Sequence, residues 1–131
     1  MGRTHIKRTD FYNIVIKKTD FFISGENIII RSYDFKDKPI NYSLKINFYN
    51  ELCNRILDAA YIEGMIELKV AVELLYSVIF QTYKSKVATK RIPQLILNVC
   101  VLKGIMYTES GEDYILKIQK EKAIEKLIKR K

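Results

Sequence analysis

The spacing of apolar residues changes near residue 50, and this change constrains the fold more than any other feature. From residue 40 to residue 48 apolar and polar residues alternate, which is the period of a strand with one buried face. From about Asn50 onward the apolar residues recur every three or four positions, the period of an amphipathic helix. A β-rich segment followed by a helical one predicts an α+β fold.

The β-rich segment is expected to cover residues 11–48 and to form an antiparallel sheet. Residues 11–16 are rich in β-branched and aromatic residues, which favour strands. Residues 21–23 and 28–30 flank Ser-Gly-Glu-Asn, a turn composition, so a hairpin is expected there. The alternating strand at residues 40–48 follows a charged loop.

Residues 50–131 are expected to be mainly helical. A first helix runs from about Asn50 to Gly64, because glycine commonly ends a helix. A second, at residues 66–83, is apolar on most sides and is expected to run through the core. A third, at residues 92–103, follows a polar connector at residues 85–90 and has Pro93 in its first turn, where proline is tolerated.

Length and charge indicate one basic domain. The 131 residues contain no repeat and no linker-like tract, so a single domain is expected. Residues 1–10 form a basic arm that is either solvated or enters a minor groove. Residues 119–131 form a basic amphipathic helix that docks on the domain or, alternatively, makes a homodimer contact. The 23 Lys and Arg against 15 Asp and Glu give a net charge of +8, which favours phosphate-rich partners such as DNA.

Neither a secretory leader nor a stretch long enough to cross a bilayer is recognisable, so a cytoplasmic protein without a membrane partner is expected. Cys53 and Cys100 fall in apolar helical patterns and are expected in the core, with a disulfide as the alternative. With one histidine and no Cys-x-x-Cys pair, no zinc site and no other cofactor is expected.

Catalysis is not expected either. His5 is the only histidine and lies in the terminal arm, so the commonest general base is missing from the folded region. Glu67-Leu68-Lys69 is similar to the Glu-x-Lys fragment of metal-dependent nucleases, but it falls in a helical pattern, and no Asp-rich motif precedes it.

Positive charge is concentrated ahead of the third helix. No acidic residue lies between Glu73 and Glu109, whereas Lys84, Lys86 and Lys90 crowd the connector. Together with the free N–H groups of a helix N-terminus, these lysines are expected to anchor a phosphate backbone. The alternative is a solvated loop with surface lysines.

The third helix also carries a candidate base-reading stripe. Arg91, Gln94 and Asn98 are spaced i, i+3, i+7 and therefore share one side of the helix. Arginine reads guanine bidentately, and glutamine or asparagine reads adenine. The alternative is that these residues are simply the polar face of a largely buried helix.

The segment after the third helix resembles the wing of the winged-helix DNA-binding superfamily. Lys103-Gly104-Ile105-Met106-Tyr107 is similar to the junction after that family's recognition helix, and residues 107–108 and 114–116 flank a tip at residues 109–113. The resemblance covers roughly residues 67–118. It implies a recognition helix with a wing behind it, and DNA binding in transcription regulation or genome maintenance. The chain departs from the family in the short space available for a second helix and in its acidic tip, so DNA contact is expected from the helix and connector.

A second function remains open. The protein is alternatively a protein-interaction module that uses the winged-helix-like part as a scaffold, for example a viral factor that binds a host protein. Heavy use of Ile, Lys, Tyr and Asn is compatible with an AT-rich genome, such as that of an archaeal virus or its host.

Overall fold

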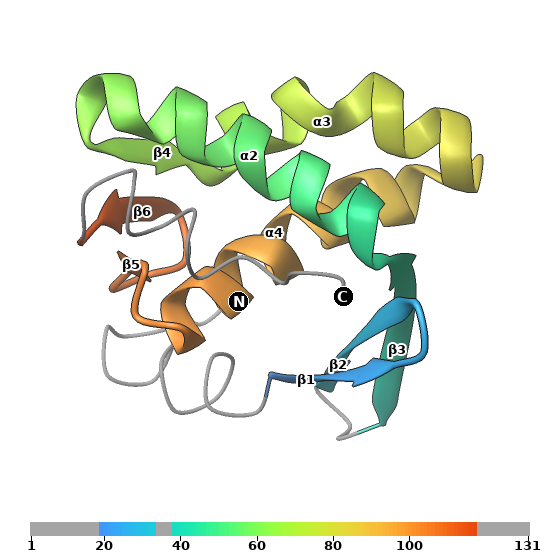
Figure 1. Ribbon diagram of the computed structural model, residues 1–131. Helices are drawn as coiled ribbons and strands as arrows, with labels where there is room; N and C mark the ends of the chain where they lie inside the picture. The colour runs from blue at the N-terminus through green and yellow to red at the C-terminus, as the bar shows by residue number, and fades with distance from the viewer. Residues whose placement is uncertain (1–18, 34–37, 118–131) are drawn as a thin grey trace, which may run out of the picture.

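The computed structural model describes residues 19–33 and 38–117, which form an α+β architecture. The elements are arranged in the order β1 (Asp20–Ser24), β2 (Asn27–Tyr33), β3 (Pro39–Lys45), α2 (Ile46–Glu63), β4 (Met65–Glu67), α3 (Leu68–Tyr83), α4 (Lys86–Leu102), β5 (Met106–Tyr107) and β6 (Asp113–Leu116) (Figure 1). The strand expected at residues 11–16, the arm at residues 1–10 and the helix expected at residues 119–131 lie outside the described residues.

The N-terminal sheet, made of β1, β2 and β3, is antiparallel and begins with the expected hairpin. Ser24 pairs with Asn27, so the turn consists of Gly25 and Glu26. Gly25 has a φ of 60°, and a glycine with positive φ at the first central position is the type II′ pattern that matches strand twist. Ile28 and Ile30 from β2 are fully buried and form the base of the core.

Helix α2 begins four residues earlier than the change of period suggests. The strand expected to continue to residue 48 ends at Lys45, so that prediction was wrong for Ile46 to Phe48. The backbone N–H of Ile46 donates to the carbonyl of Glu26 at 2.9 Å. This satisfies one of the N–H groups that a helix start leaves without an intrahelical partner. Buried Ile46 and Tyr49 then share a face, as residues three apart do on a helix. Gly64 ends α2 with a φ of 79°, as expected.

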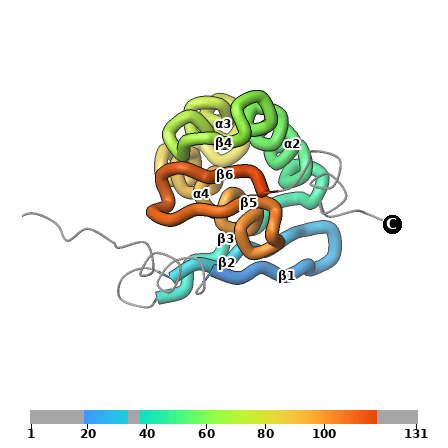
Figure 2. Tube along the Cα trace, turned by 90° about the vertical axis from the view of Figure 1, so that its left-hand side faces the viewer, coloured from blue at the N-terminus to red at the C-terminus, as the bar shows by residue number. Residues whose placement is uncertain are grey.

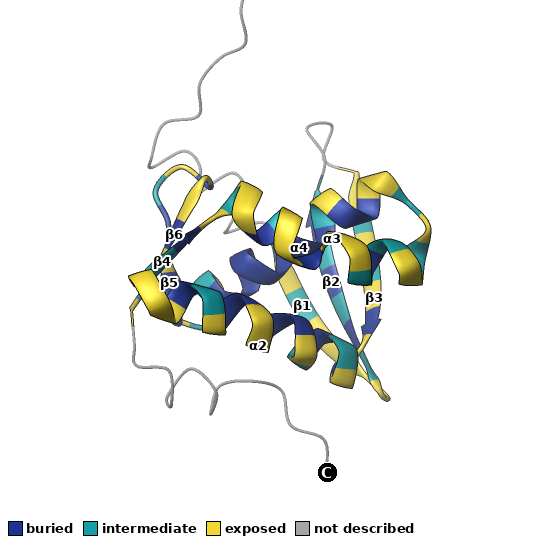
Figure 3. Ribbon diagram, turned by 90° about the horizontal axis from the view of Figure 1, so that it is seen from above, coloured by how far each residue is buried: buried dark blue, intermediate teal, exposed yellow. Residues whose placement is uncertain are grey.

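Helix α4, rather than α3, occupies the middle of the molecule. Figure 2 shows α4, β5 and β6 between the layer that contains α2, α3 and β4 and the N-terminal sheet. The six consecutive residues 95–100 of α4 are all buried (Figure 3). Helix α3 buries a narrow stripe of Ala71, Leu75 and Ile79. The prediction that the 66–83 helix runs through the core was therefore wrong, because α3 lies on the surface and covers α4.

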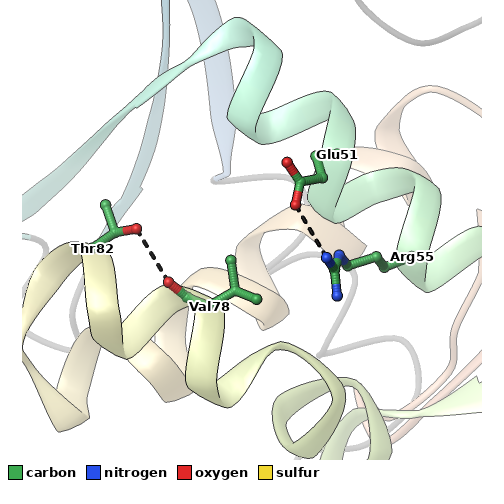
Figure 4. Close-up of polar contacts among 4 residues, drawn as sticks. All are labelled: Glu51, Arg55, Val78 and Thr82. Atoms are coloured by element: carbon green, nitrogen blue, oxygen red, sulfur yellow. Dashed lines mark hydrogen bonds and ion pairs between the residues drawn. The ribbon is translucent and has the colours of Figure 1, made fainter.

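Helices α2 and α3 lie side by side and are exposed on their outer sides. The polar contacts drawn in Figure 4 each lie within a single helix. In α2, Arg55 pairs with Glu51 at 3.2 Å, and in α3 the Thr82 hydroxyl donates to the Val78 carbonyl at 3.1 Å. An exposed i, i+4 ion pair contributes only about 0.3–0.5 kcal/mol. Buried apolar residues such as Leu52, Ile56 and Leu75 hold the helices to the core instead.

The small sheet consists of β4, β6 and β5 in that order. Strands β5 and β6 form the hairpin expected around residues 109–113, with Tyr107 opposite Ile115. Strand β4 was not expected, since Met65 to Glu67 was assigned partly to the next helix. It pairs with β6, and Glu67 lies opposite Asp113. The small sheet therefore joins the start of α3 to the hairpin that comes after α4.

Lys84, at the end of α3, provides a test of backbone strain. It is the one non-glycine residue with positive φ in the described ranges, at 55°. That conformation costs a side-chain-bearing residue about 1–2 kcal/mol, which exceeds the roughly 0.5–1 kcal/mol entropic penalty of glycine. We expect Lys84→Gly to raise the free energy of unfolding by about 0.5–1 kcal/mol, measured by urea denaturation. The control Lys90→Gly, inside α4, should lower it by about 1 kcal/mol; a loss of stability in both variants would contradict the assignment of strain to Lys84.

Candidate nucleic-acid interface

The turn between α3 and α4 consists of Lys84 and Ser85. The N–H of Lys84 donates to the Phe80 carbonyl at 2.7 Å and closes α3. Ser85 is the N-cap of α4, and its hydroxyl oxygen accepts the N–H of Ala88 at 3.3 Å. Helix α4 therefore begins at Lys86, and the polar connector predicted at residues 85–90 is instead the first part of this helix. Serine is among the strongest N-cap residues, and this signal identifies the true start.

Pro93 lies well inside α4, not in its first turn as predicted. Proline has no N–H, so the carbonyl four residues earlier, that of Thr89, receives no helical hydrogen bond from it. Thr89 is fully buried, and its hydroxyl donates to the Lys86 carbonyl at 2.7 Å. The extra bond at Lys86 and the cap at Ser85 support the helix on the N-terminal side of the proline.

The basic cluster, which we define as Lys84, Lys86 and Lys90, lies on the surface. All three lysines are exposed, and the first turn of α4 contains no acidic residue. Lys86 and Lys90 are four residues apart and so share one side of α4. The structure therefore places the predicted phosphate anchors together at the N-terminal end of α4.

The predicted base-reading stripe is divided between the surface and the core. Arg91 and Gln94 are half-buried and reach the surface, but Asn98 is only 1% exposed. The Asn98 side-chain oxygen accepts a hydrogen bond from the Tyr114 hydroxyl at 2.7 Å. Burial raises the pKa of the Tyr114 phenol, so it stays protonated and available to donate. Asn98 is thus a polar core residue that fastens β6 to α4, and it is not placed to touch a base.

The hairpin tip is compact and acidic. The Thr108 hydroxyl donates to the Asp113 carbonyl at 2.7 Å and accepts the Gly111 N–H at 3.0 Å. The Glu109 carboxylate accepts a hydrogen bond from the Tyr107 hydroxyl at 2.7 Å. These bonds hold the tip as a closed loop. Its carboxylates would repel phosphates, so a wing that contacts DNA is not supported by this geometry.

A groove of about 620 Å³ runs between the start of α3, the N-terminal half of α4 and the hairpin. Lys90, Arg91 and Gln94 line it from α4, and residues of both charges line it from the other elements: Glu67, Lys69, Glu73, Glu112 and Asp113. Sequence reasoning missed this proximity because it depends on the pairing of β4 with β6. The only local signal was the short apolar pair Met65-Ile66 after a helix-ending glycine.

Cys53 and Cys100 are both free and buried, and they lie next to each other in the core. A hydrogen bond with Cys53, together with burial, raises the pKa of the Cys100 thiol. Among residues 19–33 and 38–117, no group of three His, Cys, Asp or Glu side chains is placed to hold a metal ion. Within the same ranges, none of the helices combines the length and apolarity needed to span a membrane.

Comparisons with protein-family models, with curated proteins and with solved structures found no match for this chain. The function therefore has to be argued from the arrangement of its own side chains.

The bond between Tyr114 and Asn98 gives a direct test of how β6 is held. Tyr114→Phe removes the donor and leaves the buried Asn98 oxygen without a partner, so we expect a loss of about 1–3 kcal/mol in the free energy of unfolding. Tyr76→Phe deletes an exposed hydroxyl on α3 that forms no hydrogen bond among the described residues, and it should change stability by less than about 0.5 kcal/mol. Chemical denaturation of both variants makes the comparison, and equal effects would argue against a buried hydrogen bond at Tyr114.

Proposed function

We propose that this protein binds DNA without catalysing a reaction, as a small transcriptional regulator or a genome-maintenance factor. The proposed contact surface is the α3–α4 turn with the N-terminal half of α4. The observation that carries this proposal is the basic cluster at the start of α4, with no acidic residue in the first turn.

The energetics of this cluster favour an anionic partner. The N-terminus of a helix carries a partial positive charge, so lysines there are less favourable than acidic residues by roughly 0.3–1 kcal/mol each. Lys84 adds the cost of its left-handed backbone. Several unfavourable features at one surface site are explained if a phosphate binds there, because the lysines and the free N–H groups then act together.

Arg91 and Gln94 are the candidates for base contact. They lie three residues apart on α4, immediately after the basic cluster, and both reach the surface. In helix-turn-helix proteins the N-terminal residues of the recognition helix contact base edges. We leave Asn98 out of this surface because its side chain is buried and bonded to Tyr114.

The order of elements supports the resemblance to winged-helix proteins. Helices α2, α3 and α4 precede the β5–β6 hairpin, so a second helix fits before the recognition helix when α2 is counted as the first. If α3 were counted as the first helix, too little chain would remain before α4 for another helix. The acidic hairpin tip still favours contact through α4 alone.

The alternative function is a protein-interaction module, and the outer side of α3 favours it. Val70 and Leu74 are each 38% exposed, Tyr76 is 41% exposed, and α3 contains no charged residue after Glu73. An uncharged helix surface is better suited to a protein partner than to a phosphate backbone.

Phosphate contact is tested by the double substitution Lys86→Gln, Lys90→Gln. We expect weaker binding to duplex DNA, with the slope of log affinity against log salt reduced by about 0.9 for each lysine that contacts a phosphate. Fluorescence anisotropy titrations at several salt concentrations measure both quantities. Lys117→Gln, immediately after β6, removes a similar exposed charge and should leave the slope unchanged. If the wild-type chain binds no duplex at about 50 mM salt, the proposal fails and the protein-interaction alternative gains support.

Base contact is tested by Arg91→Lys, which keeps the charge but removes the planar fork that reads guanine. We expect the preference for the best duplex over a random duplex to fall by about 1–3 kcal/mol, while the salt slope stays constant. Competition binding against a duplex selected from a random pool measures this preference. An unchanged preference would show that Arg91 does not read bases.

A further inference from the structure

Strand β1 leaves one edge of the N-terminal sheet without a partner. The strand order is β1-β2-β3, so β1 and β3 are the edge strands. At the β3 edge the Ser43 carbonyl is engaged, because the Tyr83 hydroxyl donates to it at 2.9 Å. At the β1 edge no hydrogen bond is formed among residues 19–33 and 38–117. Within these ranges only the β3 edge is therefore engaged.

The two-residue turn after β1 determines which backbone groups point to this edge. Ser24 pairs with Asn27 across the turn, so Ser24 exchanges its backbone hydrogen bonds with β2. Backbone groups alternate in direction along an antiparallel strand, so Phe22 also bonds to β2. The N–H and C=O groups of Phe21 and Ile23 therefore point to the free edge.

The side chains of β1 leave the core face of the sheet incomplete. Ile23 lies opposite Ile28, which is fully buried, so both side chains are on the face of the sheet that packs against the core. Ile23 is nevertheless 48% exposed. Phe21 shares this face and is half-buried, with the Nζ atom of Lys103 5.8 Å from its ring centre. The apolar layer thus reaches β1 and ends there with Ile23 poorly covered.

Strand β1 also lacks the residues that usually block an edge strand. Lysine and proline commonly prevent pairing with another chain, and β1 contains neither. Its one charged residue is Asp20, which pairs with Arg31 at 3.7 Å. On the outer face Phe22 is 44% exposed. An apolar edge of this kind is a template for a further strand.

We propose that β1 pairs with β1 of a second copy of this chain, antiparallel and centred on Phe22, so that the two N-terminal sheets join into one. Phe21 of each copy exchanges backbone hydrogen bonds with Ile23 of the partner subunit, because these are the residues whose groups point outward. The same register places Phe21 beside Ile23 on the core face, where cover is missing. Asp20 lies opposite Ser24 of the partner subunit, so no like charges meet.

A second copy suits this edge because the pairing is self-complementary and nearly uncharged. In a twofold dimer the same surface serves both partners, and the register centred on Phe22 matches every outward group of β1 with its counterpart. The chain has a net charge of +8, so two copies repel each other least where the contact carries no positive charge. Strand β1 meets this condition, since Asp20 is its only charged residue.

Dimerisation would also change how the protein contacts DNA. A dimer carries two copies of the basic cluster, and twofold DNA-binding proteins contact two half-sites. This consequence rests on the proposed function, whereas the pairing of β1 does not need DNA and is measured in its absence.

Sedimentation equilibrium of the full chain without DNA tests the pairing. We expect a monomer–dimer equilibrium with a dissociation constant of about 10 μM. Ile23→Lys puts a charge on the core face beside Phe21 of the partner subunit, and it should weaken dimerisation at least about tenfold. The control Ile62→Lys introduces the same charge on α2, at a residue that is 83% exposed, and should leave the equilibrium unchanged. Circular dichroism checks that each variant is folded.

Disulfide cross-linking tests the register. Phe22→Cys places a thiol on the twofold axis, at a pair without backbone hydrogen bonds whose Cα atoms are about 4.5 Å apart, which a disulfide can span. Ser24→Cys is on the same face but lies opposite Asp20 of the partner subunit, so it should not cross-link. Mild oxidation followed by non-reducing gel electrophoresis compares the two variants. The native Cys53 and Cys100 are buried and should not contribute.

Three results would each overturn the pairing of β1. The first is a wild-type chain that stays monomeric at about 200 μM, which would also be the result if another segment of the same chain covered the edge. The second is an equal effect of Ile23→Lys and Ile62→Lys on the equilibrium. The third is cross-linking of Ser24→Cys as efficient as that of Phe22→Cys. DNA titrations report separately on the proposed function.

Discussion

The burial of α4 is the constraint around which the other described elements are arranged. A helix whose residues 95–100 are all buried needs apolar or hydrogen-bonded neighbours on every side. Helix α3 covers one side, and the small sheet supplies Tyr114, whose hydroxyl satisfies the polar group of Asn98. The N-terminal half of α4 is less enclosed, because Lys86, Lys90 and Arg91 reach the surface there. The core thus decides which part of α4 is accessible from outside.

Most features that depend on neighbouring residues were predictable from the sequence, although the local cap at Ser85 was missed, and features that depend on distant partners were not. The Gly25-Glu26 hairpin and the helix end at Gly64 arise from local backbone preferences, and the structure has both. The start of α2 was misplaced because neither α2 nor α3 has a side-chain N-cap among the described residues. The N–H group of Ile46 bonds instead to the carbonyl of Glu26, which no local pattern can reveal.

The same division applies to the candidate site. Exposed lysines could be found from polarity alone, and Lys84, Lys86 and Lys90 are on the surface, although Lys86 and Lys90 belong to α4 and not to a connector before it. Asn98 occupies the same helical face as Arg91 and Gln94, so spacing could not distinguish a base reader from a core residue. Tyr114, sixteen positions away, decides its environment. The carboxylates of the groove were also hidden, because β4 is too short to be recognised before its pairing with β6 is known.

In both α2 and α3, the first backbone N–H donates a hydrogen bond to a carbonyl in a hairpin turn. Glu26, between β1 and β2, accepts the first N–H of α2, and Glu112, at the tip before β6, accepts the N–H of Leu68 at 2.7 Å. Loop tips are usually the positions where a protein family gains and loses residues most freely. In this chain a change in the length of either loop would shift the carbonyl away from its helix. Evolutionary variation in length should therefore fall elsewhere, and relatives of this protein should keep both turns at constant length even where their sequences have diverged.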